Sequence, residues 1–412
     1  MAKLTQQHAA GSESTLRKFG PITTEMRPWH PNYDVEALSR RKRDALPSAY
    51  KAAIPVEIAE VDFDIPSGLA AEAEDAAATI IKLDAYVSAK FGSEDIAPMQ
   101  SVLLRSESAA SSQIENLTVG ARQLAIAELG GTASKNAELV SRNVRAMAAA
   151  IRLSDELDAD SILAMHSALL GGRDPQAGRW REVQVWIGAS GLSPNGATFI
   201  PPHADRLAHY LDDLTRFLRR DDLPVLVQAA VAHAQFETIH PFTDGNGRTG
   251  RALLHAMLRH SELTSRVTVP ISAGLLADTE SYFDALTAYR AGDFAQIVRQ
   301  LCEASARAAA DGRWLVDTLA EVRTGWLEVM QVRAGSAGRR LLNLLIGQPA
   351  VSVAFIEQQL QVSGTAARRA VEQAVGAGVL TESSDRKRDR VFIAQDAIDV
   401  LDKFSERAGR RG

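Results

Sequence analysis

Cysteine is nearly absent from this chain of 412 residues. Cys302 is the only cysteine, so no disulfide can form within the chain, and a metal cluster held by cysteines is excluded. This usage is typical of a reducing compartment, and residues 1–15 lack the apolar stretch of a signal peptide. No uncharged run approaches the roughly 20 apolar residues that cross a membrane. We therefore expect a cytoplasmic protein without a membrane partner.

An excess of positive charge is also missing. Lysine and arginine total 46 against 51 acidic residues, a net charge of −5, which argues against a protein that coats nucleic acid with its whole surface. Internal repeats and low-complexity tracts are absent from the sequence. Apolar residues make up 46% of the chain, which over this length is enough to bury the cores of two or three domains.

Apolar residues recur at helical spacing along most of the chain, so we expect a mainly α fold. Helices are predicted at residues 67–91, 101–120, 137–157, 161–170, 203–219, 225–239, 248–260, 279–290 and 294–332. A β-hairpin is predicted at residues 182–200, because residues 182–188 alternate like a strand and residues 197–200 can return alongside them. The polar, aperiodic residues 1–30 predict a flexible tail.

Residues 239–251, Ile-His-Pro-Phe-Thr-Asp-Gly-Asn-Gly-Arg-Thr-Gly-Arg, are dense in polar groups between two predicted helices. Pro241 disfavours helical backbone at His240, so the preceding helix should end there and present the imidazole to a cleft. The glycines on either side of Asn246 can turn successive N–H groups to one side at the start of the next helix. Such a helix N-terminus is an anion cradle.

Arg248 and Arg251 lie three residues apart on this next helix, so both guanidinium groups can reach one polyphosphate. Asp244 is the only carboxylate of the segment and is the natural ligand for a Mg²⁺ that bridges phosphates. The alternative is a glycine-rich turn with solvated side chains. It is disfavoured because a histidine, an aspartate, an asparagine and two arginines converge in one short segment.

This segment resembles the signature of the Fic family, His-x-Phe-x-(Asp/Glu)-Gly-Asn-Gly-Arg-x-x-Arg, and matches it at every defined position. The resemblance implies a Fic-type helical core that moves AMP from ATP to a Ser, Thr or Tyr hydroxyl of a target protein, or of itself, with pyrophosphate leaving. It makes His240 the base that takes the hydroxyl proton and Asp244 the Mg²⁺ ligand, with Phe242 anchored in the core. Related Doc-type kinases carry lysine where Gly247 stands, so nucleotidyl transfer is favoured over phosphorylation.

The same resemblance assigns the nucleotide contacts. The residues expected to bind ATP are Gly245, Asn246, Gly247, Arg248, Thr249, Gly250 and Arg251, with Tyr282 beside the adenine. Phe283 stands where the family often has a second tyrosine. Structural roles are expected for the histidines of the predicted helices, His166, His233 and His255, because they lack the spacing of a metal site.

Residues 111–116, Ser-Ser-Gln-Ile-Glu-Asn, resemble the (Ser/Thr)-x-x-x-Glu-(Gly/Asn) inhibitory motif of that family. Ser111 and Glu115 lie one helical turn apart and share a face. The resemblance implies that Glu115 pairs with Arg251 and blocks the productive seating of the γ-phosphate. Alone, such a pattern most often marks a solvated glutamate, but beside the complete signature the inhibitory role is favoured.

The hairpin at residues 182–200 resembles the flap of the Fic family, whose edge holds the target segment by strand addition. The alternative is a structural hairpin that only covers the core. We expect the target protein to dock on this hairpin.

The C-terminal residues predict a separate module after a Gly-Ser-Ala-Gly hinge at residues 335–338. Helices at residues 339–345, 352–361 and 364–376 precede short strands at residues 379–380 and 391–393, which flank the basic run 385–390. This order resembles a winged helix, with residues 365–374 as the recognition-type helix. DNA binding through residues 352–393 is one interpretation, and a docking or homodimerising wing is the other. Acidic residues among the basic ones disfavour DNA.

The expected organisation is a tail (1–30), a helical region with the inhibitory helix (31–125), a Fic catalytic core (126–310), a linking helix (311–334), a winged-helix-like domain (335–400) and a tail (401–412). The leading hypothesis is an autoinhibited protein adenylyltransferase that uses ATP and Mg²⁺. Two alternatives stay open. One is removal of AMP from modified proteins, with Glu115 aligning a water, and the other is a DNA-binding regulator with a nucleotide-sensing core.

Overall fold

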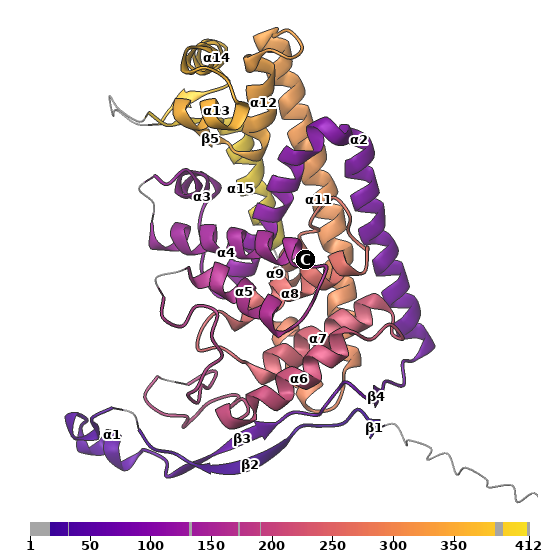
Figure 1. Ribbon diagram of the computed structural model, residues 1–412, viewed down its shortest axis with the longest axis vertical. Coiled ribbons are helices and arrows are strands. Elements are labelled where there is room, and N and C mark those ends of the chain that lie inside the picture. Colours follow the sequence, from indigo (N-terminus) through magenta and orange to yellow (C-terminus); the bar gives the residue numbers. More distant parts are fainter. Residues whose placement is uncertain are drawn as a thin grey trace, which may run out of the picture.

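Two long helices form the frame of the protein. A computed structural model describes residues 17–31, 33–131, 134–171, 174–189, 191–383 and 390–409, except for the side chains of residues 92–95. Helix α2 (Ser67–Ile114) has 48 residues and helix α11 (Ala295–Met330) has 36. They run side by side along the long axis of the molecule, and the other helices pack around them (Figure 1).

The mainly α fold predicted from the sequence is confirmed. The shorter helices are α1 (Arg40–Asp44), α3 (Ala121–Glu128), α4 (Lys135–Arg152), α5 (Ala159–Leu170), α6 (Leu207–Leu218), α7 (Val225–Ile239), α8 (Asn246–His260), α9 (Ile271–Leu276), α10 (Thr279–Arg290), α12 (Ala337–Gly347), α13 (Val353–Leu360), α14 (Gly364–Gly376) and α15 (Gln395–Gly409), with 3-10 turns η1 (Val35–Ala37) and η2 (Ala204–Arg206). Helices α7, α10 and α14 have the predicted limits. The predicted helices 67–91 and 101–120 are instead the single helix α2, which continues through Pro98.

The N-terminal residues form strands where the sequence predicted a tail. Strand β2 (Thr23–Pro28) pairs antiparallel with β3 (Ala49–Ile54), and β1 (Arg17–Lys18) pairs with β4 (Val61–Asp62). Trp29 and Tyr50 belong to one small apolar cluster, and Glu25 of β2 forms a salt bridge with Arg206. These strands make the arm at the base of Figure 1. The predicted tail is therefore wrong for residues 17–28, because pairing with a distant strand orders a segment that has no local pattern.

The C-terminal module lies at the opposite end of the molecule from this arm (Figure 1). Its helices α12, α13 and α14 accompany a sheet in the order β5-β7-β6, formed by β5 (Ala350–Val351), β6 (Thr381–Glu382) and β7 (Phe392–Ile393). Strand β5 was not expected from the sequence. Residues 384–389, most of the predicted wing, lie outside the described residues, so the winged-helix resemblance, DNA binding and dimerisation stay predictions.

Residues 401–409 belong to helix α15, so the predicted tail is wrong for these residues; residues 410–412 lie outside the described residues. Helix α15 buries Leu401, Phe404 and Ala408, and it packs along α11. The burial of this apolar face stabilises the helix, which is why this segment is ordered. The module is also tied to α2, because the buried Arg105 donates hydrogen bonds to the carbonyl oxygen of Gly347 (2.6 Å) and to Oε1 of Gln348 (2.7 Å).

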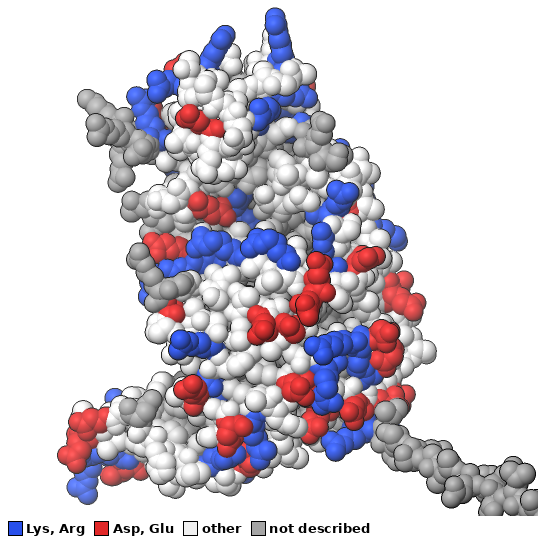
Figure 2. Space-filling model, in the orientation of Figure 1, with Lys and Arg blue, Asp and Glu red and all other residues white. Residues whose placement is uncertain are grey.

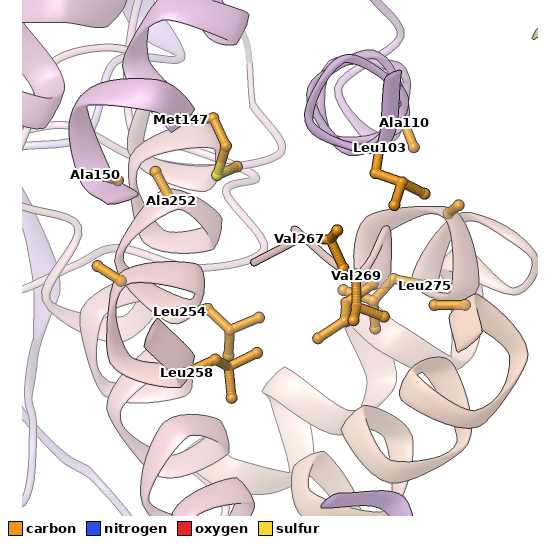
Figure 3. Close-up of a cluster of buried hydrophobic side chains, with 14 of the residues drawn as sticks. Leu103, Ala110, Met147, Ala150, Ala252, Leu254, Leu258, Val267, Val269 and Leu275 are labelled. Carbon is orange, nitrogen blue, oxygen red and sulfur yellow. The ribbon is translucent and has the colours of Figure 1, made fainter. Parts of the chain in front are cut away.

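Helices α2 and α8 share one apolar core. Leu103 and Ala110 of α2 lie near the segment that leads into α9, while Met147 and Ala150 of α4 flank Ala252 of α8 (Figure 3). Buried polar groups join the same helices, since Glu107 of α2 accepts hydrogen bonds from Ser272 and lies 2.8 Å from Nε2 of His255. The C-terminal end of α2 is thus held firmly beside the start of α8.

Charges of both signs are interspersed over the face shown in Figure 2, and neither sign covers it. This distribution agrees with the small net charge of the chain. Among the helices within the described ranges, none is long and apolar enough to cross a membrane.

Gly274 marks the closest approach of α9 to α11. A Cβ atom at this position would lie 2.1 Å from the backbone oxygen of Ala304, so Gly274→Ala should destabilise the protein by at least about 2 kcal/mol. Gly325 of α11 provides a matched control, because a Cβ there meets nothing within 4 Å. Gly325→Ala should raise stability by up to about 1 kcal/mol through helix propensity. The measurement is the thermal unfolding midpoint of each variant, and a Gly274→Ala midpoint at or above the wild type contradicts this packing.

Candidate functional site

His240 occupies the sharp turn that ends α7. Its backbone is left-handed, with φ 49° and ψ 61°, and its N–H donates to the carbonyl oxygen of Phe236 at 2.8 Å. Because Pro241 follows, the helix cannot continue, as the sequence predicted. The imidazole is therefore carried on a fixed turn at the rim of the helix, with its side chain 20% exposed.

Arg181 holds this turn in place. Its Nε donates to the carbonyl oxygen of His240 (2.8 Å), and its backbone N–H donates to that of Pro241 (2.9 Å). The same guanidinium reaches the carbonyl oxygens of Val183 (3.0 Å) and Pro202 (2.6 Å), so it connects the start of segment 182–200 and the residues just after it to the turn at His240. Burial lowers the pKa of Arg181 to about 10. No sequence pattern marks Arg181, because its acceptors are backbone atoms distant along the chain.

Phe242 is fully buried, as expected, and stacks on two aromatic rings. Its centroid lies 3.6 Å from that of His166 and 4.9 Å from that of Trp180. His166 accepts from the N–H of Gly178 at Nδ1, so its Nε2 carries the hydrogen and donates to the carbonyl oxygen of Asp244 (3.1 Å). The expected structural role of His166 is thus support of the loop that bears Asp244.

Asn246 braces the loop from inside. Its Oδ1 accepts from the N–H of Phe242, and its Nδ2 donates to the carbonyl oxygen of Phe242, both at 2.9 Å. The side chain is buried, so the predicted phosphate contact of its amide is not available in this structure. Gly245, with φ 75°, starts α8 in the left-handed region, where a Cβ would lie 2.7 Å from Leu169.

Arg248 and Arg251 project from one face of α8 onto the end of α2. Helix α2 ends at Ile114, so Glu115 stands at its C-terminus. Oε2 of Glu115 lies 2.7 Å from Nε of Arg248, and Oε1 lies 2.9 Å from Nη2 of Arg251. One carboxylate therefore bridges both arginines, whereas the sequence predicted contact with Arg251 alone.

Ser111 completes the contact between the two helices. Its hydroxyl accepts from Nε of Arg251 at 2.8 Å, and its carbonyl oxygen accepts from Nη2 at 2.7 Å. Gly247 permits this approach, because a Cβ there would lie 2.5 Å from Oε1 of Glu115. The structure thus brings together the two residues of the inhibitory motif and the end of the signature. The effect of the contact on activity stays a prediction.

The two arginines are nearly buried and are paired with acidic side chains. Their side chains are only 5% and 2% exposed; Glu115 contacts both, and Oδ1 of Asp244 lies 3.4 Å from Nη2 of Arg248. Burial lowers the pKa of Arg251, but Glu115, Tyr282 and Glu237 together raise it above its ordinary value.

Asp244 lies at the exposed edge of the same site. Its side chain is 73% exposed, and its Oδ1 accepts from the N–H of Gly245 at 2.7 Å. Across the described part of the chain, no cluster of three or more acidic, histidine or cysteine side chains could hold a metal by itself. A single exposed carboxylate next to a phosphate cradle suits Mg²⁺, which takes its other ligands from phosphates and water.

The remaining predicted nucleotide contacts face the interior. Thr249 is buried, and Gly250 lies against α7, where a Cβ would be 2.9 Å from Phe236 and 3.1 Å from Oε1 of Glu237. Tyr282 is 1% exposed, and its hydroxyl lies 2.8 Å from Nε2 of His233. Burial raises the pKa of Tyr282. The structure thus offers no accessible ring at Tyr282, whereas Phe283 is 50% exposed.

Segment 182–200 turns back on itself without forming the two predicted strands. Ile187 and Phe199 make an isolated antiparallel bridge, in which the N–H of Ile187 donates to the carbonyl oxygen of Phe199 at 2.9 Å. A side-chain hydrogen bond also joins the two arms of the segment, since Nε2 of Gln184 donates to the carbonyl oxygen of Pro201 at 3.0 Å. The path of the hairpin is therefore as predicted, but its strand pairing is limited to one bridge.

Comparisons with known proteins identify the domain. Residues 156–258 match the profile of the Fic/DOC family. The chain is 32% identical over 155 residues to protein adenylyltransferase fic-1 of Caenorhabditis elegans, covering 37% of this chain and 28% of that protein. It is 29% identical over 161 residues to protein adenylyltransferase Fic of Nematostella vectensis, covering 38% and 34%. The chain thus matches only about a third of the length of these relatives.

The crystal structure of a Fic family protein from Desulfovibrio desulfuricans aligns with a TM-score of 0.47 and 22% identity, over 77% of this chain and 95% of that chain.

The carboxylate of Glu115 should stabilise the protein in the absence of nucleotide. Glu115→Gln removes the carboxylate that both buried guanidinium groups share and leaves Arg248 with only the more distant Asp244, so we expect a loss on the order of 2 kcal/mol. Pyrophosphate should restore much of this loss, because it binds the folded state at the same arginines. The test is the thermal midpoint with and without pyrophosphate, with Glu321→Gln at an exposed position of α11 as control. Equal midpoints for Glu115→Gln and the control contradict this assignment.

Proposed function

Because this chain carries a Fic domain, we propose that the protein transfers AMP from ATP to a Ser, Thr or Tyr hydroxyl of a target protein, and that Glu115 restrains this activity. The observation that carries the proposal is the pair of buried arginines on α8 beside the histidine turn of α7, with both guanidinium groups held by one carboxylate. A general base and a polyphosphate site stand at the ends of one loop.

In the proposed reaction, His240 takes the proton of the target hydroxyl. The hydroxyl oxygen then bonds to the α-phosphorus of ATP, and the bond from that phosphorus to the pyrophosphate oxygen breaks. The N–H groups at the start of α8 stabilise negative charge on the phosphates, and Arg248 and Arg251 hold the outer ones. These donors are fixed before substrate binds, because α8 is packed into the core shown in Figure 3.

Asp244 is the residue that would hold Mg²⁺. The ion, when bound, neutralises charge on the phosphates and favours departure of pyrophosphate. The exposure of this carboxylate and its place at the start of α8 support the assignment.

The proposed restraint is a competition for the same guanidinium. Glu115 occupies Arg251 at 2.9 Å and Arg248 at 2.7 Å, so the γ-phosphate of ATP can reach these groups only after the carboxylate moves away. ATP seated without these contacts is not aligned for attack. Segment 182–200 is the proposed docking site for the target, and its exposed Val183 offers an apolar contact beside the histidine turn.

Replacing the base should abolish transfer without unfolding the protein. His240→Ala should lower the rate by roughly 10²- to 10⁴-fold, because the hydroxyl loses its proton acceptor. The turn should persist, since Arg181 holds the backbone oxygen of His240 and not its ring. The measurement is incorporation of labelled AMP, with nucleotide binding followed by calorimetry. Transfer at the wild-type rate excludes His240 as the base.

Removing the carboxylate should activate the enzyme. Glu115→Gly frees both arginines, and a gain on the order of 10- to 100-fold is expected if the restrained state is favoured by about 1.4 to 2.8 kcal/mol. Arg251→Ala should not activate, because it removes the partner of the carboxylate and the partner of the phosphate together.

Asn116→Gly is the matched control for the effect of a new glycine. Its backbone already has φ 62°, a conformation that glycine adopts without strain. The rate of labelled AMP incorporation should rise for Glu115→Gly and not for Asn116→Gly. An unchanged rate in Glu115→Gly contradicts the restraint, and a lower rate points to a role of Glu115 in AMP removal.

A further inference from the structure

We infer that Glu237 is a positioning residue for His240, which fixes the tautomer of the imidazole and balances the positive charge that the ring gains during AMP transfer. This inference rests on the proposed function. Glu237 lies on the last turn of α7, three residues before His240, and its side chain is 9% exposed. Its Oε2 lies 3.8 Å from Nδ1 of His240, within ion-pair distance.

Both side chains carry polar atoms that are not otherwise used. Nδ1 of His240 and Oε1 of Glu237 are buried, and neither has a hydrogen-bond partner among the described residues. A buried carboxyl without such bonds opposes folding, so a structural role does not account for a glutamate at this position. Gly250 of α8 makes the room for it, because a Cβ there would lie 3.1 Å from Oε1 of Glu237.

The surroundings of the ring disfavour a positive charge. Burial, together with Arg181 and Arg290, lowers the pKa of His240 to about 3. The ring is therefore neutral and can accept a proton, but its protonated form has two cations nearby. Glu237 is the one carboxylate within ion-pair distance of the ring in the described part of the chain. Its negative charge stabilises the imidazolium that forms when His240 accepts the hydroxyl proton.

The charged groups around Glu237 come from three other elements. Arg251 lies on α8, Arg290 on α10, and Glu115 at the end of α2. Burial raises the pKa of Glu237 to about 7, against the opposing effect of the two arginines and with a further rise from Glu115. The carboxyl therefore loses its proton near neutral pH, and the deprotonated form is the one that can pair with the ring.

The proton moves as follows. Nδ1 lies 3.8 Å from Oε2 of Glu237, an ion-pair distance longer than a hydrogen bond. In the inferred arrangement the carboxylate favours a hydrogen on Nδ1, which leaves the lone pair of Nε2 for the target hydroxyl. As the hydroxyl oxygen bonds to the α-phosphorus and the bond to pyrophosphate breaks, the hydroxyl proton passes to Nε2. The resulting imidazolium then keeps its Nδ1 hydrogen directed at Oε2 of Glu237.

The test measures AMP transfer in a Glu115→Gly parent, where the restraint is removed. Glu237→Gln has nearly the same shape but no charge. It should lower kcat by roughly 10- to 100-fold at about pH 8, with an unchanged KM for ATP. Because the deprotonated carboxyl is the active form, the parent rate should rise with pH through the pKa of Glu237. That pKa lies below the value of about 7 in the wild type, since Glu115, one cause of its rise, is absent from the parent. This rise should be missing in Glu237→Gln. Glu237→Asp should keep the rise at a lower rate, and it provides the test if the Gln variant fails to fold.

Gln235→Ala is the matched control on the same helix. The Gln235 side chain is buried and donates to the carbonyl oxygen of Val56, away from His240. It should lower the thermal midpoint and keep the pH profile of the parent. The same kcat and pH profile in Glu237→Gln and the parent overturn the inference alone. A parent that transfers no AMP overturns the proposed function, and the inference falls with it.

Discussion

The bridge from Glu115 to Arg248 and Arg251 is the contact on which the rest of the site depends. It places a carboxylate at the proposed polyphosphate site, 2.7 and 2.9 Å from two nearly buried guanidinium groups. Arginines so buried need a counter-charge, because an unpaired charge away from water costs several kcal/mol or more. In the structure that counter-charge comes from Glu115 at the end of α2, and in the proposed function a nucleotide would supply it instead. The contact of Glu115 with the two arginines therefore stabilises the ligand-free protein and, in the proposed function, also hinders the binding of ATP phosphates at the same guanidinium groups.

The fold keeps this contact at a fixed geometry. Helix α2 packs along α11 and shares an apolar core with α8, and the buried Glu107 adds polar bonds to α9 and α8. Arg105, two turns before the start of the inhibitory motif, binds the end of α12 in the C-terminal module. Helix α2 is thus the element shared by the phosphate site and that module. Arg181 likewise connects the turn at His240 to segment 182–200 and the residues that follow it, through hydrogen bonds to backbone oxygens.

The sequence was sufficient for features whose cause is local. The limits of α7 follow from its apolar pattern and Pro241, and the proposed catalytic loop is recognisable because its polar groups are confined to residues 239–251. Features made by distant residues could not be predicted. Strand β2 forms only because β3 pairs with it, and the side chain of Asn246 is used by the backbone of Phe242. Glu237 belongs to no recognisable motif, and its proximity to His240 and its burial against α8 appear only in the folded structure.

The most direct test of the competition is a pair of crystal structures with a non-hydrolysable ATP analogue and Mg²⁺, one of the wild type and one of Glu115→Gly. The account predicts that the γ-phosphate contacts the guanidinium of Arg251 in Glu115→Gly. In the wild type it predicts that Glu115 keeps its contact with Arg251 and that the γ-phosphate lies elsewhere. A wild-type structure in which Arg251 binds both the γ-phosphate and Glu115 would contradict it.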